Sequence, residues 1–339
     1  MATIKDVARL AGVGVGTASR VVSGHGSVAP ATAQRVRQAI AELGFRPSHA
    51  ARTLLSGSSQ MIGVYIPVLK GTFYTPLLAA IDNELRLSGR HMVVAFGSGD
   101  GDAHEQAVQG IEFLIERGCD GVVVMSNAMT EHDLRSLGPK RDDLVFLNHH
   151  IDTVPEQCFT IDHERGGALA AQALIKAGHR RFAVIGGPDD TADNLSRLKG
   201  FHDELARSGI ASADVQALSS DFSSEGGWLA ARSLVSSGHR FTALFCANDE
   251  MAIGALAFCH QEGIRVPASI SVLGYDDIQS AEFTAPQLST VHIPWRQLTL
   301  NGLRWLLNHC YREGLPVVRH LPPSMTLRSS VGVASDSAA

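Results

Sequence analysis

The spacing of hydrophobic positions changes once along this chain and divides it into two parts. Over residues 4–23 the apolar side chains recur at intervals of three and four, which predicts two short amphipathic helices joined at Gly12. A glycine there can adopt the positive φ of a tight turn, and Val13 can fill the angle between the helices. The pattern is that of a helix-turn-helix whose second helix covers residues 15–23. The two helices would pack through Val7, Ala8, Ala11, Ala18, Val21 and Val22.

A third helix is predicted over residues 30–43. Pro30 suits a first helical turn, apolar side chains from Val36 to Leu43 share one side, and Gly44 ends the helix. Three helices would close a small all-α unit over residues 1–47. Residues 48–59 are rich in small side chains and end in a Ser/Gly run, which predicts a linker.

From residue 61 onwards, apolar strands alternate with amphipathic helices. Strands are predicted over 61–67, 91–97, 121–126 and 143–149, with helices over 73–88 and 105–117. A second cycle begins near residue 159, with helices over 166–177, 194–208, 225–236 and 250–262 and strands over 181–186, 243–247 and 269–275. This alternation predicts two α/β halves, each a parallel sheet with helices on both faces.

Composition places the chain among soluble proteins. It has 339 residues, 45% of them hydrophobic, which is enough for a large core in two or three domains. There is no apolar export signal and no apolar run of membrane-spanning length. The five cysteines are scattered without zinc-site spacing, which indicates reduced thiols. We expect a cytoplasmic protein with no membrane contact, metal or cofactor.

The net charge of −5 conceals a basic amino-terminal segment. Residues 1–59 carry seven Lys and Arg against two acidic residues, a balance of +5, so the remainder carries −10. A basic module on an acidic body suits a headpiece that binds DNA phosphates, although an ordinary solvated surface could carry the same charges.

The outward positions of the second helix are candidates for contacting DNA. They offer a methyl group, a glycine that permits close approach, hydroxyls and a guanidinium, which suit base edges and phosphates in a major groove. A dinucleotide-binding loop is the weaker reading, because no strand precedes the glycines and Thr17 stands at the third glycine position. A helical pair without a ligand is the other alternative. The candidates are Val15, Gly16, Thr17, Ser19 and Arg20.

Polar and aromatic residues follow the predicted strands of the core. Ligands of parallel sheets bind beyond the carboxyl ends of strands, and carboxylates, amides, a guanidinium and aromatic faces suit the hydroxyls and C–H groups of a sugar. We interpret Asp249 and Asp277 as helix N-caps rather than ligand contacts. Packing in the core or in a dimer is an equal alternative for Phe73 and Tyr74. The remaining candidates are Asn148, Arg197, Phe222, Asn248, Asp276 and Trp295.

The amino-terminal motifs resemble those of the lac repressor/galactose repressor family of bacterial transcription regulators, and the similarity extends over nearly the whole chain. They are Ile4-Lys5-Asp6-Val7-Ala8, Ala11-Gly12-Val13, Thr17, Ser19-Arg20-Val21 and Gly44-Phe45-Arg46-Pro47. The resemblance adds Ile4 to the DNA-binding candidates. It also implies that residues 48–59 form a hinge helix on operator DNA. There Leu54 would enter the minor groove, flanked by the small residues Ala50 and Ala51.

The family's core is similar to two-lobed periplasmic sugar-binding proteins, and the resemblance implies effector contacts in the cleft between the lobes. The sequence contexts of Arg197, Asn248 and Asp276 match the family's effector positions, and Phe73, Asn148, Phe222 and Trp295 are further candidates. The chain departs from the family at several positions. It has His149 where arginine is common, and Gly14, Ala18, Ser23 and Ser48 in the headpiece and linker.

Taken together, these features predict a homodimeric, DNA-binding repressor that recognises a palindromic operator and is switched allosterically by a small sugar. The predicted units are 1–47, 48–59 and 60–339, with lobe 1 near 60–159 and 291–320 and lobe 2 near 160–290 and 321–331. The sequence lacks the G-x-S-x-G, H-E-x-x-H and phosphate-loop motifs of common enzymes, so no catalytic residue is expected. A sugar transport protein and a sugar-active enzyme on the same fold are the alternatives.

Overall fold

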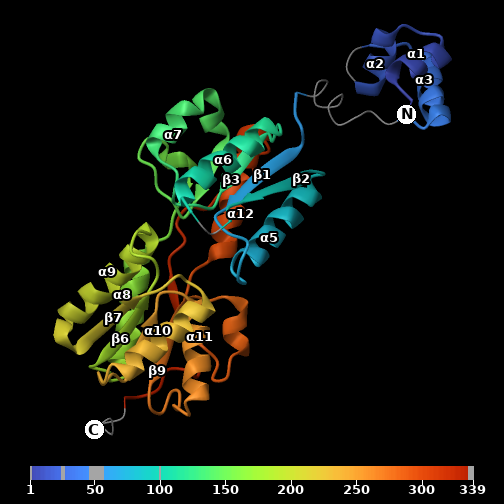
Figure 1. The fold of residues 1–339 in the computed structure, drawn as a ribbon. Helices are drawn as coiled ribbons and strands as arrows, with labels where there is room; N and C mark the ends of the chain where they lie inside the picture. Colours follow the sequence, from blue (N-terminus) through green and yellow to red (C-terminus); the bar gives the residue numbers. More distant parts are fainter. Residues whose placement is uncertain (1, 24–26, 46–56, 99–100, 335–339) are drawn as a thin grey trace.

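The computed structural model describes residues 2–23, 27–45, 57–98 and 101–334. The first of its parts is a small body of three helices, α1 (Ile4–Ala11), α2 (Val15–Ser23) and α3 (Pro30–Leu43), which stands apart from the α/β core in Figure 1. The predicted turn is present, because Gly12 ends α1 with a φ of 64°. The core of this headpiece is formed by Val7, Ala8, Ala11, Ala18, Val36 and Ala39.

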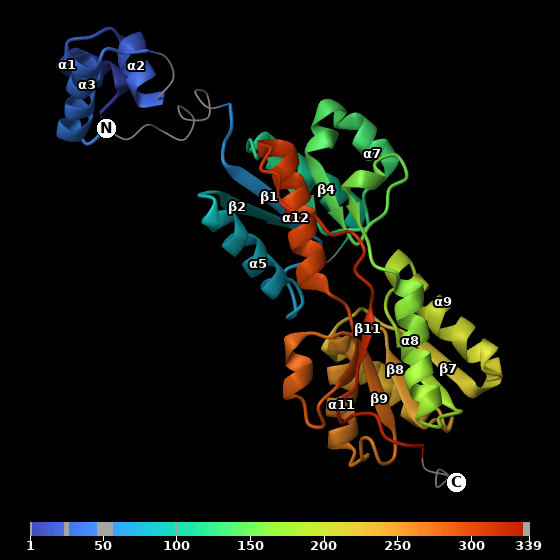
Figure 2. The same cartoon turned by 180° about the vertical axis from the view of Figure 1, so that it is seen from behind.

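The first lobe is built on a five-stranded parallel sheet of order β2-β1-β3-β4-β5. Helices cover both of its faces (Figures 1 and 2). Its elements are β1 (Met61–Ile66), α5 (Tyr74–Leu87), β2 (His91–Phe96), α6 (Ala103–Glu116), β3 (Gly121–Val124), α7 (Glu131–Ser136), β4 (Leu144–Leu147) and β5 (Cys158–Phe159).

The second lobe contains a six-stranded sheet of order β11-β10-β9-β8-β6-β7, parallel except for β11. The paired helices α8 and α9 approach so closely that a Cβ at Gly200 would lie 1.9 Å from the backbone oxygen of Glu164. Its elements are α8 (His163–Lys176), β6 (Phe182–Gly186), α9 (Ala192–Arg207), β7 (Val215–Ser219), α10 (Ser224–Ser236), β8 (Ala243–Cys246), α11 (Asp249–Gln261), β9 (Ser271–Asp276), β10 (Ser289–His292) and β11 (Ser324–Thr326).

The chain passes between the lobes three times. After β5 it enters α8, and after β10 it returns as α12 (Trp295–Tyr311), which packs on α5, β3 and β4 of the first lobe. From the end of α12 it runs back to β11 in the second sheet. No helix among the described residues is long and apolar enough to cross a membrane.

The predicted fold class is therefore confirmed, whereas several elements differ from the pattern-based expectation. Helix α8 begins at His163, three residues before the predicted start, because the Asp162 side chain accepts a hydrogen bond from the Arg165 amide at 2.8 Å and caps the helix there. The helices α7 and α12 and the strands β5, β7, β10 and β11 were not predicted. The segments that follow β8 and β9 contact the first lobe: Glu250 after β8 bonds Thr72, and Asp276 at the end of β9 bonds Trp295 of α12.

Candidate functional site

Arg197 is the centre of a buried side-chain cluster where the two lobes meet. Its side chain is 3% exposed and donates to the Ala247 carbonyl at 2.7 Å and to Asp193 Oδ2 at 3.0 Å. The guanidinium lies 4.4 Å from the ring centre of Tyr275, a cation–π distance, and 3.7 Å from Asp276 Oδ1. One buried cation thus lies between two carboxylates.

Asp276 connects this arginine to an aromatic group that belongs to the other lobe. It ends β9 with a φ of 108°, and its Oδ1 accepts a hydrogen bond from Trp295 Nε1 at 3.1 Å. The Trp295 ring lies edge-on to Phe73 at 5.2 Å. In the described part of the chain, Asp276 Oδ2 accepts no hydrogen bond. The carboxylate therefore keeps acceptor capacity beside a flat apolar face.

Asp193 of α9 bridges the two lobes directly. Its Oδ2 accepts from Asn148 Nδ2 at 3.3 Å and its Oδ1 from Asn127 Nδ2 at 3.4 Å, both from the first lobe. The Asn148 oxygen in turn bonds His163 Nε2 at 2.6 Å, and His163 Nδ1 bonds the Tyr275 hydroxyl at 2.9 Å. A single network thus runs from the end of β4 to the end of β9. We call Asn148, His163, Asp193, Arg197, Tyr275, Asp276 and Trp295 the inter-lobe cluster.

A second bridge lies between the loop before α5 and the start of α11. Glu250 Oε1 accepts from the Thr72 amide at 2.6 Å and from the Thr72 hydroxyl at 3.0 Å. Thr72 precedes Phe73 in the first lobe, and Glu250 follows β8 in the second. The lobes are therefore joined by hydrogen bonds that a relative movement would break.

Burial dominates the electrostatics of the inter-lobe cluster. It raises the pKa of Asp276 to about 7, against the opposing effects of Arg197 and of the Trp295 hydrogen bond. Burial, together with the charge of Arg197, holds the pKa of His163 well below its ordinary value, so the imidazole is neutral at pH 7. Arg197 remains charged, because Asp276 and Asp193 outweigh its own desolvation and raise its pKa.

Unusual backbone geometry occurs in the inter-lobe cluster and next to it. Six non-glycine residues in the described part of the chain have positive φ, and four of them are Asn148, Phe222, Asp276 and Asp277. Such conformations are disfavoured for residues with a Cβ and persist where the surroundings fix them. At Asn148 and Asp276 they turn the chain sharply after β4 and β9, where both side chains lie in the junction between the lobes.

Two sequence interpretations were wrong. Asp249 is not the N-cap of α11: Asn248 accepts from the Met251 amide at 2.9 Å, while buried Asp249 accepts from Thr290 Oγ1 at 2.6 Å and from the Ile278 amide at 2.8 Å. Asn248 and Asp249 are adjacent and both are residue types that cap helices, so the sequence does not decide between them; the Thr290 partner on β10 does.

Asp277 is not a cap either. It accepts from Arg328 at 2.7 Å and pairs with His292 at 2.9 Å, partners that are 51 and 15 residues away in sequence.

Phe222 and Asn248 lie at the margin of the cluster: Asn248 Nδ2 donates to the Phe222 carbonyl at 2.9 Å, and the Phe222 ring centre is 5.9 Å from the Arg197 guanidinium.

The structure thus brings together all seven residues proposed from the sequence as effector contacts, directly or through one neighbour. Sequence reasoning missed Asp193, His163, Tyr275 and Asn127. Asp193 precedes Arg197 by one helical turn, a spacing that brings oppositely charged side chains together and was the available signal. The others carried none.

The headpiece exposes part of the predicted DNA-reading surface. Val15 is 44% exposed, Gly16 and Arg20 are exposed, and Thr17 and Ser19 are half-buried. A Cβ on Gly16 would meet no atom within 4 Å, so the backbone there is open to a close approach. Ile4 is half-buried and packs against the headpiece core. Ala50, Ala51 and Leu54 lie outside the described residues.

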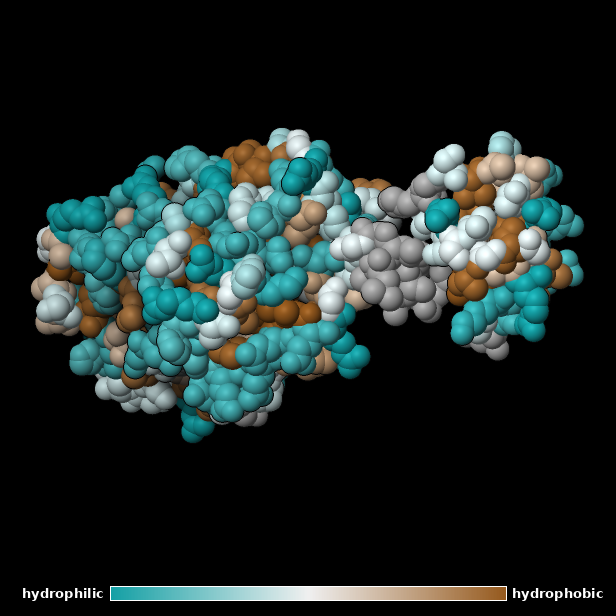
Figure 3. Space-filling model, turned by 90° about the horizontal axis from the view of Figure 1, so that it is seen from above, coloured by the Kyte–Doolittle hydropathy of each residue, from teal (hydrophilic) through white to brown (hydrophobic). Residues whose placement is uncertain are grey.

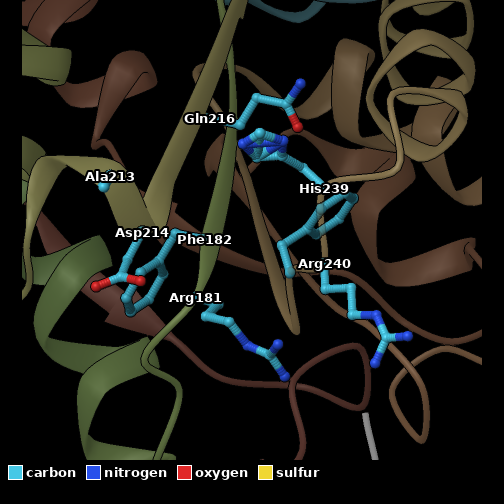
Figure 4. A pocket seen from close by; sticks show the side chains of 8 residues that line it. Arg181, Phe182, Ala213, Asp214, Gln216, His239 and Arg240 are labelled. Atoms are coloured by element: carbon cyan, nitrogen blue, oxygen red, sulfur yellow. The ribbon is translucent and has the colours of Figure 1, made fainter. Parts of the chain in front are cut away.

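A pocket away from the lobe junction lies at the amino-terminal ends of β6, β7 and β8 (Figure 4). It is lined by Arg181, Phe182, Ala213, Asp214, Gln216, His239, Arg240 and Phe241. It belongs to the opposite edge of the second sheet from the inter-lobe cluster and contains none of the predicted site residues.

Comparisons with known proteins match this arrangement at both ends of the chain. Residues 3–48 match the family model described as bacterial regulatory proteins, lacI family, and residues 171–331 match a periplasmic binding protein-like domain. The chain is 32% identical to the HTH-type transcriptional regulator GalR of Escherichia coli K12 over 337 residues, covering 99% of this chain and 97% of GalR. It is 33% identical to the HTH-type transcriptional repressor PurR of Vibrio atlanticus, covering 98% and 99%.

Solved structures give the same result. A LacI-family transcriptional regulator from Burkhoderia phymatum is 48% identical with a TM-score of 0.77, covering 80% of this chain and 99% of that one. The lac repressor dimer bound to operator and the anti-inducer ONPF is 28% identical with a TM-score of 0.82, covering 98% and 99%. The helix-turn-helix headpiece on a two-lobed core, with these matches, places the chain among DNA-binding transcription regulators. Within that class, the chain belongs to the lacI family of bacterial regulatory proteins.

Proposed function

We propose that this regulator is a homodimeric repressor that binds a palindromic operator in the cytoplasm and releases it when a small, uncharged sugar binds between the lobes. The observation that carries the proposal is the inter-lobe cluster, which joins a guanidinium, two carboxylates and aromatic faces at the ends of strands. We retain the sequence-based limits for the headpiece (1–47), the hinge (48–59) and the two lobes.

The charge of the cluster supports a neutral, hydroxyl-rich effector. Arg197 is the one cation of the inter-lobe cluster. Asp193 balances its charge, and Asp276 adds a second carboxylate when it is ionised, above its pKa of about 7. A phosphate or carboxylate on the ligand would face these carboxylates. A neutral sugar can instead donate a hydroxyl hydrogen bond to Asp276 Oδ2 and pack the C–H face of its ring on Trp295. The transcriptional regulator CelR, which is 30% identical to this chain, has a solved structure in complex with cellobiose, a neutral sugar.

The bridges between the lobes support a switch. Asp193 holds Asn148 and Asn127 across the junction, so a ligand that takes over these hydrogen bonds changes the relative stability of two lobe arrangements. Shifting the population from 99:1 to 1:99 requires a differential binding energy of about 5.5 kcal/mol. Several hydrogen bonds to buried charged groups, at about 1.5–3 kcal/mol each, can supply it.

Dimerisation is supported by apolar side chains exposed on the first lobe. Leu87 of α5 is 87% exposed, Phe96 of β2 is 56% exposed and Leu69 is 54% exposed. Hydrophobic patches interrupt the hydrophilic face of the core that is seen from above in Figure 3. One headpiece covers one half-site, so a palindromic operator requires two copies. The lac repressor structure with a TM-score of 0.82 is a dimer on operator DNA.

The alternative functions have less support. A transport protein would have no use for the helix-turn-helix and its open α2 surface. A sugar-active enzyme would need an acid and a base in the junction. There the Asp193 carboxylate is paired with Arg197 and His163 is hydrogen-bonded at both ring nitrogens, so Asp276, whose pKa is raised to about 7, has no second acid–base group of the cluster free to act with it.

The proposal is tested on the full-length protein with a duplex selected from a random DNA pool. Thermal shift against a panel of neutral sugars identifies the effector, since a ligand at 100 times its Kd stabilises by about 2.7 kcal/mol. Gel shifts with and without that sugar give the sign of the response. Asp276→Ala is expected to bind the duplex like the wild type and to lose the response. Tighter DNA binding with the sugar contradicts the induction mechanism, and binding of sugar phosphates in preference to neutral sugars contradicts the effector class.

A further inference from the structure

The short turn where the chain enters the core from the headpiece is held by a single carboxylate. Asp120, which precedes β3, accepts hydrogen bonds from the Ser59 amide at 2.8 Å, the Gln60 amide at 2.8 Å and the Ser58 hydroxyl at 2.6 Å. A fourth bond comes from the Tyr311 hydroxyl at 2.7 Å. We call Asp120 with these four partners the linker clamp.

The clamp fixes an otherwise disfavoured backbone conformation. Gln60 has a φ of 58°, in the left-handed region that residues with a Cβ rarely adopt. Ser59 is 5% exposed, and the Gln60 carbonyl accepts from the His91 amide at 3.0 Å. Because the turn departs from preferred geometry, its direction depends on the bonds that Asp120 supplies.

Asp120 is charged when it makes these bonds. Burial acts to raise its pKa, but the hydrogen bonds from Ser58, Ser59, Tyr311 and Gln60 outweigh burial and hold the pKa below its ordinary value. An asparagine at this position would keep one acceptor oxygen and lose the charge.

The fourth partner places the clamp on the same helix as the inter-lobe cluster. Helix α12 begins at Trp295, which donates to Asp276, and ends at Tyr311, which donates to Asp120. The Tyr311 ring is fixed by Arg90, whose guanidinium lies 3.8 Å from the ring centre and forms an ion pair with Glu313 at 2.5 Å. One continuous helix of 17 residues therefore touches both the junction between the lobes and the exit toward the headpiece.

We propose that Asp120 and Tyr311 are positioning residues that set the path of the chain from the core to the headpiece, and that operator affinity depends on this clamp. A homodimer must bring two headpieces to fixed half-sites, so an unfixed exit adds configurations that cannot bind both at once. The inference rests on the proposed DNA-binding function, while the clamp itself can be tested separately from it.

The clamp is tested by measuring hydrogen exchange of the Ser59 and Gln60 amides in the full-length protein. We expect faster exchange in Asp120→Ala than in the wild type, with Asp120→Asn intermediate and Tyr311→Phe, which keeps the ring under Arg90, closest to the wild type. Unchanged exchange in Asp120→Ala would overturn the clamp, whatever the protein binds.

The dependence of DNA affinity on the linker clamp is measured with the duplex that the wild type selects from a random pool. Asp120→Ala is expected to lower affinity for that duplex at least tenfold. The matched control is Asp133→Ala in the same lobe, which removes an aspartate that accepts from the Thr130 hydroxyl at 2.7 Å and from His104 at 2.9 Å, on α7 rather than at the exit.

The control separates positioning from simple loss of stability. If Asp133→Ala lowers the melting temperature and leaves DNA affinity near the wild-type value, while Asp120→Ala lowers affinity, the proposal holds. Equal affinity losses in the two variants, or wild-type affinity in an Asp120→Ala protein whose amides exchange faster, overturn it. Failure of the wild type to select any duplex contradicts the DNA-binding function, and the exchange measurement then still decides whether the clamp exists.

Discussion

Neutralising Asp276 is expected to stabilise the protein at alkaline pH while removing a candidate effector contact. In the folded chain, burial raises the pKa of this carboxyl to about 7 from the ordinary value of 3.8. Between pH 3.8 and about pH 7, the folded state therefore keeps a proton that the unfolded state has released. The contribution of Asp276 to stability must fall as pH rises through this window, because the unfolded state is favoured by losing the proton.

The magnitude follows from the two pKa values. A difference of about 3 corresponds to about 4 kcal/mol, at about 1.4 kcal/mol for each pH unit. Asp276→Asn retains the shape of the side chain and removes the charge, and Arg197 keeps its ion pair with Asp193 at 3.0 Å. We therefore expect the variant to exceed the wild type in unfolding free energy by about 4 kcal/mol at pH 8, with the gain vanishing near pH 4.

The assay is urea unfolding of both proteins at intervals between pH 4.5 and 8.5, with the difference in unfolding free energy plotted against pH. Asp277→Asn is a matched control of opposite sign. Burial acts to raise the pKa of Asp277, but its bonds to His292 and Arg328 outweigh burial and lower it. Asp277 contributes stability above pH 3.8, which is lost as pH falls through its folded pKa, so the asparagine variant should be less stable at pH 8. An Asp276→Asn difference that is flat across the pH range, or negative at pH 8, would refute the reasoning.

Three further predictions follow from packing and charge. Gly200→Ala should destabilise the second lobe by about 3 kcal/mol or more in urea unfolding, because its Cβ would lie 1.9 Å from the Glu164 carbonyl oxygen. A smaller loss of unfolding free energy would mean that α8 and α9 are not in close contact. Gly16→Ala should stabilise α2 by about 1 kcal/mol in thermal melts of the headpiece, and its added methyl group should weaken DNA binding in gel shifts. Unchanged DNA affinity would mean that Gly16 does not face the DNA. Burial holds the folded pKa of His163 well below 6.5, so this residue's own contribution to stability is lost as pH drops below 6.5. The unfolding free energy of His163→Gln minus that of the wild type should therefore rise as pH falls through this range, and a difference that does not change with pH contradicts the assignment.

The sequence by itself determined the local elements and the order of the parts. Helices α2 and α3 have the predicted limits, because apolar spacing, Pro30 and Gly44 act within a few residues of each helix. The alternation of strands and helices predicted the parallel sheets, since a parallel pair needs a crossover and every crossover helix leaves its own periodic pattern. Candidate effector residues could be named because strand ends are visible in the sequence.

Only the tertiary structure decided which of these residues act together. Asp249 and Asn248 are equivalent as helix caps in the sequence, and the choice depends on Thr290, 41 residues further along the chain. The Tyr311 hydroxyl reaches an aspartate 191 residues away, and Asp193 bridges the lobes through Asn148, 45 residues before it. Such pairs are selected by the packing of whole lobes rather than by any local preference, so periodicity contains no signal for them.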